Sequence, residues 1–305
     1  MRFLTTTAVL VAMTATAAFA DDSWKADYPV VRMGVLSGEN EADRLKRYEP
    51  FRQYMADKLG VEVEIFTAGS YDGVVQAMAG DQIEFARFGS SSYAAAYTAT
   101  DGKVVPLLTT ITEAGNTGYI SVIMTRCDSG LDTLDDLEGL VLAFADPDST
   151  SGYAVPYFNL VDQGYEPTEF FENVPFSGSH EAGVLGVVEG TYDAAATWAD
   201  RPGWGNWSRM EAKGMIEPGT VCVIWESPEI TSGPLTTRNN LPQALVDDFV
   251  AAHKAFPTEM PQAFMELQGM DGTEEDPDVG YVEVNHERYQ WIIDMRAWLR
   301  EQRRG

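Results

Sequence analysis

Positive charge and histidine are scarce in this chain of 305 residues. It carries 21 Lys and Arg against 47 Asp and Glu, and the net charge of −26 argues against nucleic acid or an anionic membrane as a partner. The three histidines, His180, His253 and His286, are far apart, and no pair has the spacing of metal ligands. We therefore expect no nucleic-acid binding and no metal site. The negative net charge does not exclude an anionic ligand, because local dipoles act within about 10 Å while distant surface charge is screened.

Long hydrophobic runs are missing after the first twenty residues. The chain opens with Arg2 and an uncharged run over Phe3–Ala20 that ends in the small-x-small pattern Ala18-Phe19-Ala20. These features predict a secretory signal peptide over residues 1–20. No later run approaches the roughly 20 apolar residues of a membrane-spanning helix. We expect export to the periplasm, with a membrane reached only through a partner protein.

Cysteine is nearly absent as well, with Cys127 and Cys222 alone. In an exported protein, two cysteines are compatible with one disulfide, which requires a short Cα separation that the sequence does not give. Two buried free thiols are the alternative.

Sequence signatures of catalysis are also missing. The chain has no G-x-S-x-G nucleophile motif and no glycine-rich phosphate-binding fingerprint. It shows no cluster of metal ligands or nucleophiles. We expect a protein that is not an enzyme and that needs no cofactor.

Strand-like and helical patterns alternate along the chain, which is typical of an open α/β sheet. About 285 residues follow the expected signal peptide. A single hydrophobic core seldom stabilises a chain of that length, so two lobes are expected. The first set of elements comprises Val30–Leu36, a helix opening at Pro50, Val61–Phe66, Tyr71–Ala79 and Phe85–Phe88.

A second α/β set is expected in the middle of the chain, and three helices are expected at its end. The middle set comprises Tyr119–Thr125, Leu140–Phe144, a helix from about Tyr153, a helix over Glu181–Glu189, Ala194–Trp198 and Val221–Trp225. The final helices are Gln243–Phe256, Met260–Leu267 and His286–Arg303. We predict lobe I from residues 21–118 and 232–305, with lobe II, residues 119–231, inserted into it. Two strands, Tyr119–Thr125 and Val221–Ser227, are predicted to cross at the hinge.

The most informative motif is the loop Ala145–Tyr153, which follows a strand and precedes a helix. Its three consecutive hydroxyl residues are Ser149, Thr150 and Ser151, and we call these three residues the cradle. Free N–H groups and the positive end of a helix dipole favour an anion at such a turn, where Gly152 allows close approach. Ordinary helix capping by one hydroxyl is the alternative.

A second helix start carries an imidazole. Ser177-Gly178-Ser179-His180-Glu181 precedes the helix expected over Glu181–Glu189 and places His180 beside its N-terminus. A structural role for a single histidine is the alternative.

These motifs occur in the order found in a known family. The chain resembles the phosphonate, phosphite and phosphate binding proteins of ABC importers, the PhnD type, from about Val31 to Pro234. The resemblance implies a two-lobed periplasmic-binding-protein fold, also called a Venus flytrap. Its strongest motifs are Pro50-Phe51, Leu59-Gly60-Val61, Tyr71-x-Gly-x-x-Gln76-x-Met78, Gly118-Tyr119, Asp146-Pro-x-Ser-Thr-Ser-Gly152, His180-Glu181 and Ile224-Trp-x-Ser-Pro228.

The resemblance also implies roles for individual residues. Tyr71 and Tyr119 match an aromatic pair that donates hydroxyls to the ligand, the cradle matches a hydroxyl and amide site, and His180 matches an imidazole that contacts a phosphonate oxygen. Asp200 matches an acidic position that holds the ammonium group of aminoalkyl phosphonates. The same relatives have a second carboxylate where this chain has Gly233.

The function implied is capture of a phosphonate for an ABC importer by closure of two lobes, with 2-aminoethylphosphonate as the expected ligand and the importer permease as the partner. The chain is expected to be a monomer. The alternatives are a protein that binds phosphite, methylphosphonate or phosphate, and a ligand sensor for a membrane receptor.

Overall fold

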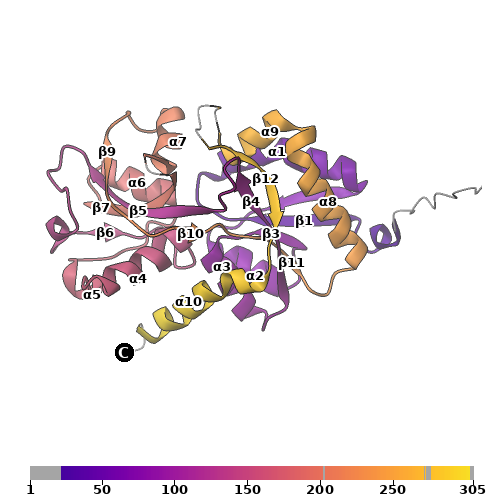
Figure 1. The fold of residues 1–305 in the computed structure, drawn as a ribbon, viewed down its shortest axis with the longest axis horizontal. Coiled ribbons are helices and arrows are strands. Elements are labelled where there is room, and N and C mark those ends of the chain that lie inside the picture. Colours follow the sequence, from indigo (N-terminus) through magenta and orange to yellow (C-terminus); the bar gives the residue numbers. More distant parts are fainter. Residues whose placement is uncertain (1–21, 202, 271, 273–275, 303–305) are drawn as a thin grey trace, which may run out of the picture.

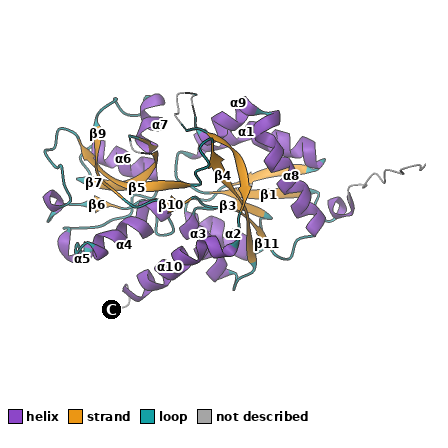
Figure 2. Cartoon of the chain, in the orientation of Figure 1, coloured by secondary structure: helices purple, strands orange, loops and turns teal. Residues whose placement is uncertain are grey.

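Two sheets, each covered by helices, form two lobes that lie side by side in the computed structural model (Figures 1 and 2). The structure describes residues 22–302 except residues 202, 271 and 273–275. The expected signal peptide lies outside the described residues. Within them, no helix is long and apolar enough to cross a membrane. The predicted α/β fold with two lobes is confirmed.

The first sheet has the strand order β12-β4-β11-β3-β1-β2. Its strands β1, β2 and β3 run parallel, while β4, β11 and β12 join antiparallel. The bounds are β1 Val30–Val35, β2 Glu62–Phe66, β3 Phe85–Arg87, β4 Val104–Thr112, β11 Leu235–Arg238 and β12 Asp278–Glu283.

Helices cover both faces of this sheet. Val31, Met33 and Val35 of β1 alternate toward one buried cluster, which also holds Phe51 and Phe249. The other face packs on a separate buried cluster. The helices of this lobe are α1 Glu41–Leu59, α2 Tyr71–Ala79, α3 Ser90–Ala99, α8 Gln243–Glu259 and α9 Pro261–Gln268, with a short 3₁₀ helix over Asp22–Ala26.

The second sheet has the order β10-β5-β7-β6, with β8 beside β7 and β9 beside β5. Its strands are β5 Gly118–Arg126, β6 Leu142–Ala143, β7 Ala194–Arg201, β8 Trp204–Gly205, β9 Val221–Glu226 and β10 Ile230–Thr231. The helices of this lobe are α4 Val155–Asp162, α5 Pro167–Phe170, α6 His180–Val188 and α7 Asn206–Ala212, with a 3₁₀ turn over Asp135–Leu137.

The chain passes between the lobes at residues 113–117, from β4 to β5, and at residues 232–234, from β10 to β11. Tyr119–Thr125 and Val221–Ser227, the two strands predicted to cross at the hinge, do not make the crossings, because β5 and β9 pair with each other inside the second sheet. The lobe boundaries predicted at residues 118/119 and 231/232 stay a proposal. The assignment of the strands to two separate sheets supports them.

The first long helix begins earlier than its proline indicates. Helix α1 starts at Glu41 and contains Pro50 in its interior, so the predicted start at Pro50 is wrong. The side chain of Asn40 accepts hydrogen bonds from the N–H groups of Ala42 and Asp43, and this cap fixes the true start.

The C-terminal helix α10, Gln290–Gln302, follows a 3₁₀ turn over His286–Tyr289 and lies against both lobes (Figure 1). Its Arg296 donates to Ser91 of α3 in the first lobe at 2.7 Å and pairs with Asp148 of the second lobe at 2.5 Å. Trp298 packs edge-on against Phe158 of α4. Helix α10 therefore ties the two lobes together on one side.

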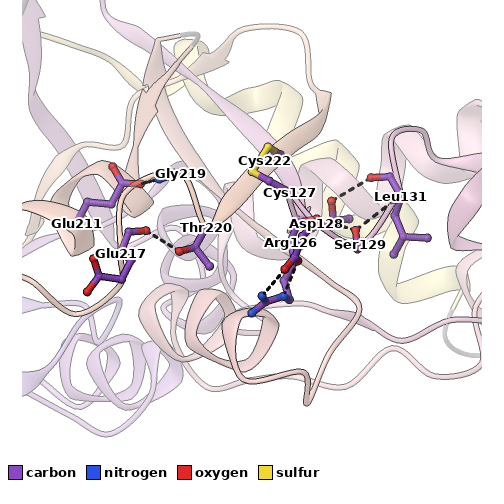
Figure 3. The surroundings of a disulfide bond; sticks show 11 residues. Arg126, Cys127, Asp128, Ser129, Leu131, Glu211, Glu217, Gly219, Thr220 and Cys222 are labelled. Carbon is purple, nitrogen blue, oxygen red and sulfur yellow. Dashed lines mark hydrogen bonds and ion pairs between the residues drawn. A yellow bond between two sulfur atoms is a disulfide. The ribbon is translucent and has the colours of Figure 1, made fainter.

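Cys127 and Cys222 form a disulfide, with a Cα separation of 4.9 Å. Figure 3 shows the bond beside the turns that connect the ends of β5 and β9 to the rest of the second lobe. The bond joins two strands that are already paired, Thr125 lying opposite Cys222 in the register. Of the two alternatives, one disulfide or two buried free thiols, the structure contains the disulfide.

Candidate functional site

A cavity of about 390 Å³ lies between the two lobes and is lined by residues of both. All seven residues expected in the site line it, namely Tyr71, Tyr119, Ser149, Thr150, Ser151, His180 and Asp200. They come from the first lobe (Tyr71) and the second (the other six). The structure therefore brings together residues that span more than a hundred positions of sequence.

The cradle lies where β6 leads, through a turn, into a single turn of π-helix over Thr150–Ala154. The Ser149 hydroxyl caps this turn by accepting from the Gly152 N–H at 3.0 Å. A side chain at Gly152 does not fit, because its Cβ would lie 2.8 Å from both the Ser149 hydroxyl and the His180 ring. Turns of π-helix are frequent at functional sites. Capping and a ligand site are therefore compatible here, since Ser149 caps while Thr150 and Ser151 line the cavity.

Two tyrosines direct their hydroxyls at the cradle. The Tyr71 hydroxyl lies close enough to Ser149, and the Tyr119 hydroxyl close enough to Thr150 and Ser151, for these neighbours to influence their pKa values. Burial raises the pKa of Tyr119 to about 12 and raises the pKa of Tyr71 further. Both phenols stay protonated near neutral pH and remain available as donors to an anion.

His180 is the first residue of α6 and is 4% exposed. Its Nε2 lies 3.3 Å from the Ser149 hydroxyl, and its Nδ1 lies 3.1 Å from the hydroxyl of Thr197 on β7. Burial lowers the pKa of His180 to about 4, so the ring is neutral at pH 7. A neutral imidazole between two hydroxyls contributes hydrogen bonding but no charge.

Hydrogen bonds join the two lobes around the cradle. The Asp146 carboxylate accepts from the Tyr71 N–H at 3.2 Å, and the Thr150 hydroxyl accepts from the Ser91 N–H at 2.8 Å. Tyr71 begins α2 and Ser91 lies in the first turn of α3, so the N-termini of two helices of the first lobe face the cradle. The positive ends of their dipoles favour an anion there. The described structure is a closed arrangement of the lobes.

A cation that sequence reasoning missed lies beside the cradle. Arg44 of α1 is 2% exposed and lines the cavity, where its charge acts on Tyr71. It donates to the Glu39 carbonyl at 3.0 Å, and its Nε has no hydrogen-bond partner among the described residues. Burial lowers the pKa of Arg44, yet a guanidinium stays protonated near neutral pH. The cradle itself contains no Lys or Arg, but the cavity around it includes this buried cation.

Asp200 lies near the end of β7, where its charge acts on Tyr119, and about half of its side chain is exposed. It pairs with Arg209 of α7 at 3.5 Å. Arg209 in turn lies over the rings of Trp198 and Trp204, 4.5 and 5.3 Å from their centroids. Asp200 lines the cavity, and its carboxylate is more exposed than a position beside a buried strand suggests.

The structure explains the glycine at residue 233. A Cβ on Gly233 would lie 2.0 Å from the Phe88 carbonyl oxygen, so no side chain fits there. A different carboxylate, Asp278 of β12, lines the cavity and interacts with Asp200. Burial raises the pKa of Asp278 to about 6, with repulsion by Asp200 and Asp276 acting in the same direction and Arg87 and Arg209 acting against it.

Arg87 and Asp278 also line the cavity, and the sequence contains only weak indications that they do. Arg87 ends β3, and the carboxyl ends of parallel strands commonly form ligand crevices. Its position at the end of a predicted strand therefore indicates a place in the site. Asp278 ends an acidic stretch that is typical of a loop, and only the pairing of β12 with β4 identifies it as a strand residue. Among the described residues, no cluster of His, Cys, Asp and Glu could hold a metal ion.

Two α/β lobes, two connecting segments and a polar cavity between them define a two-lobed solute-binding protein. The neighbours in three dimensions agree. A binding-protein component of an ABC phosphonate transporter from Pseudomonas aeruginosa superposes with a TM-score of 0.76 at 25% identity, over 88% of this chain and 86% of that one. A protein from Prochlorococcus marinus in complex with methylphosphonate also gives a TM-score of 0.76, at 18% identity over 89% and 98% of the two chains, a likeness of fold alone.

The sequence identifies the family. Residues 33–279 match the family described as "ABC transporter, phosphonate, periplasmic substrate-binding protein", and the chain belongs to it. It is 29% identical to the phosphonates-binding periplasmic protein of Escherichia coli over 222 residues, 71% of this chain and 63% of that protein. It is 27% identical to a phosphate-import protein of Mycolicibacterium smegmatis over 80% of this chain and 78% of that one. The match thus spans less than two thirds of the Escherichia coli relative.

Proposed function

We propose that this protein captures a phosphonate in the periplasm and delivers it, as a monomer, to the permease of an ABC importer, with 2-aminoethylphosphonate as its ligand. The observation that carries the proposal is the convergence of hydroxyl groups from both lobes on the cradle. The family to which the chain belongs supports the coarser part of this proposal. Its members are substrate-binding transport components rather than enzymes.

The phosphoryl group would occupy the cradle. Its oxygens accept from Tyr71 in one lobe and from Tyr119, Thr150 and Ser151 in the other, so ligand and closure stabilise each other. Hydrogen bonds to a charged acceptor contribute roughly 1.5–3 kcal/mol each, and several converge here. The buried charge of Arg44 and two helix N-termini add to the attraction.

The amine would extend toward Asp200 and Asp278. These carboxylates repel each other, and that repulsion contributes to the raised pKa of Asp278. An ammonium group between them removes the repulsion and restores a counter-charge to the half-buried Asp278. Asp278 thereby takes the part that Gly233 leaves without a side chain, and Arg209 remains the partner of Asp200 until the ligand enters.

Calorimetry with the purified protein tests the proposal. We expect 2-aminoethylphosphonate to bind more tightly than methylphosphonate, phosphite, phosphate and sulfate. Asp200→Ala should weaken the aminophosphonate by roughly 1 kcal/mol, because the carboxylate is half exposed, and spare methylphosphonate, which has no amine. Tighter binding of phosphite or methylphosphonate would reject the aminophosphonate. Equal losses for both ligands in the variant would assign Asp200 a structural role, and turnover of any ligand would contradict a binding function.

The sensor alternative shares this ligand site and differs only in the membrane partner. Reconstitution with the permease and ATPase distinguishes them, since transport of the phosphonate is expected only for an importer. No feature of the described residues favours the sensor.

A further inference from the structure

The end of the cavity away from the cradle carries charges of both signs. Four of the charged residues that line it are coupled to one another: Arg87 and Asp278 from the first lobe, and Arg209 and Asp200 from the second. We call these four residues the charged end of the cavity. Electrostatic coupling joins them, because Asp278 interacts with Arg87, Asp200 and Arg209. An amine alone would use the two carboxylates and leave the guanidinium groups unexplained.

Arg87 is the informative member. It donates to the Gln268 side chain at 3.1 Å and lies near the Tyr48 hydroxyl, both neutral groups. Among the described residues, no carboxylate lies within ion-pair distance of its guanidinium, in contrast to Arg209, which pairs with Asp200. Burial opposes the charge of Arg87, yet Tyr48, Tyr281 and Asp278 together raise its pKa. A fixed cation thus faces the cavity with neutral direct partners, and a bidentate carboxylate is the group that a guanidinium recognises best.

The size of the cavity leaves room for such a group. Its volume of about 390 Å³ lies in the lower part of the range of roughly 300–1,000 Å³ for small-molecule sites, and it equals the liquid volume of roughly 13 water molecules. A two-carbon aminophosphonate fills only part of that space. A substituent on its amine-bearing carbon can therefore extend toward Arg87 without displacing the wall residues.

We propose that the charged end recognises a zwitterionic amino-acid head group, so that the preferred ligands are phosphonates with a carboxylate and an ammonium on the same carbon. Arg87 binds the carboxylate, and Asp200 and Asp278 receive the ammonium. The head group brings one charge of each sign, and Arg209, which pairs with Asp200, partly offsets the second carboxylate. This inference rests on the proposed binding of the phosphoryl group by the cradle and refines the class of ligand.

Calorimetry with three matched phosphonates tests it. They are 2-aminoethylphosphonate, 2-amino-3-phosphonopropanoate, which adds a carboxylate on the amine-bearing carbon, and 3-phosphonopropanoate, which has the carboxylate without the amine. We expect the wild-type protein to bind the amino acid at least about tenfold more tightly than 2-aminoethylphosphonate, because an ionic hydrogen bond is gained. Arg87→Gln should remove this preference and change the affinity for 2-aminoethylphosphonate by less than about threefold.

Arg32→Gln is the matched control, since Arg32 pairs with Glu64 on the first sheet and does not line the cavity. It should leave all three affinities unchanged. The inference is overturned if the wild-type protein binds 2-aminoethylphosphonate as tightly as the amino acid, a comparison that needs no variant. It is also overturned if Arg87→Gln weakens both ligands equally. Failure of the proposed function has a different signature, namely that none of the three phosphonates binds.

Discussion

His180 makes the stability of this protein depend on pH, and one substitution should remove that dependence. The ring is buried, and its pKa is lowered from 6.5 to about 4. As pH falls, the unfolded chain binds a proton at about pH 6.5 while the folded chain does so only near pH 4. The contribution of the neutral ring is therefore complete above about pH 6.5 and is lost progressively down to about pH 4. A difference of about 2.5 pKa units corresponds to roughly 3 kcal/mol.

The assay is urea unfolding of wild-type protein and His180→Gln at about pH 7.5 and about pH 4. Carboxylates titrate alike in both proteins, so the comparison cancels their effect. Between about pH 7.5 and about pH 4, we expect the free energy of unfolding to decrease in both proteins. The decrease should be roughly 3 kcal/mol smaller in the variant than in the wild type. His253→Gln is the matched comparison, because burial lowers the pKa of His253 to about 3 and this ring does not line the cavity.

Both single variants should therefore show a shallower pH dependence, and only His180→Gln should also weaken binding of methylphosphonate. If His180→Gln loses stability as steeply as the wild type, the buried neutral imidazole is not a feature of the folded protein, and its assignment to the ligand site fails with it.

Three further outcomes follow from particular contacts. Ser151→Ala should weaken methylphosphonate binding by about 1–3 kcal/mol in calorimetry, and unchanged affinity would reduce the cradle to a helix cap. Gly233→Ala should destabilise the protein by at least roughly 1–3 kcal/mol in thermal unfolding, because its Cβ would lie 2.0 Å from the Phe88 carbonyl; unchanged stability would contradict that crowding. Replacing Cys127 and Cys222 together by serine should cost roughly 2–5 kcal/mol of unfolding free energy and leave ligand affinity unchanged, since neither cysteine lines the cavity; a large loss of affinity would link the disulfide to closure.

The sequence was sufficient for the features that depend on neighbouring residues. The cradle could be recognised because strand, turn and helix start lie within one short segment, and the N-terminal dipole acts on the loop directly before it. The bounds of α2 were likewise predicted correctly, since an apolar stripe and the cap at Ser70 mark it locally.

Features that depend on distant segments could not be read in this way. Arg44, Arg87 and Asp278 meet only because α1, β3 and β12 surround one cavity, and no local pattern places β12 beside β4. The start of α1 was misplaced for a different reason. Pro50 favours a helix start in general, but the Asn40 cap and the packing of the whole helix against α8 outweigh the hydrogen bond that the proline removes.

A crystal structure of the protein with 2-aminoethylphosphonate tests the central claim most directly. The account predicts that the phosphoryl oxygens contact the hydroxyls of Tyr71, from one lobe, and of Tyr119 and Ser151, from the other, while the amine lies near Asp200 and Asp278. A phosphoryl group held at the charged end of the cavity, or by one lobe alone, would contradict it.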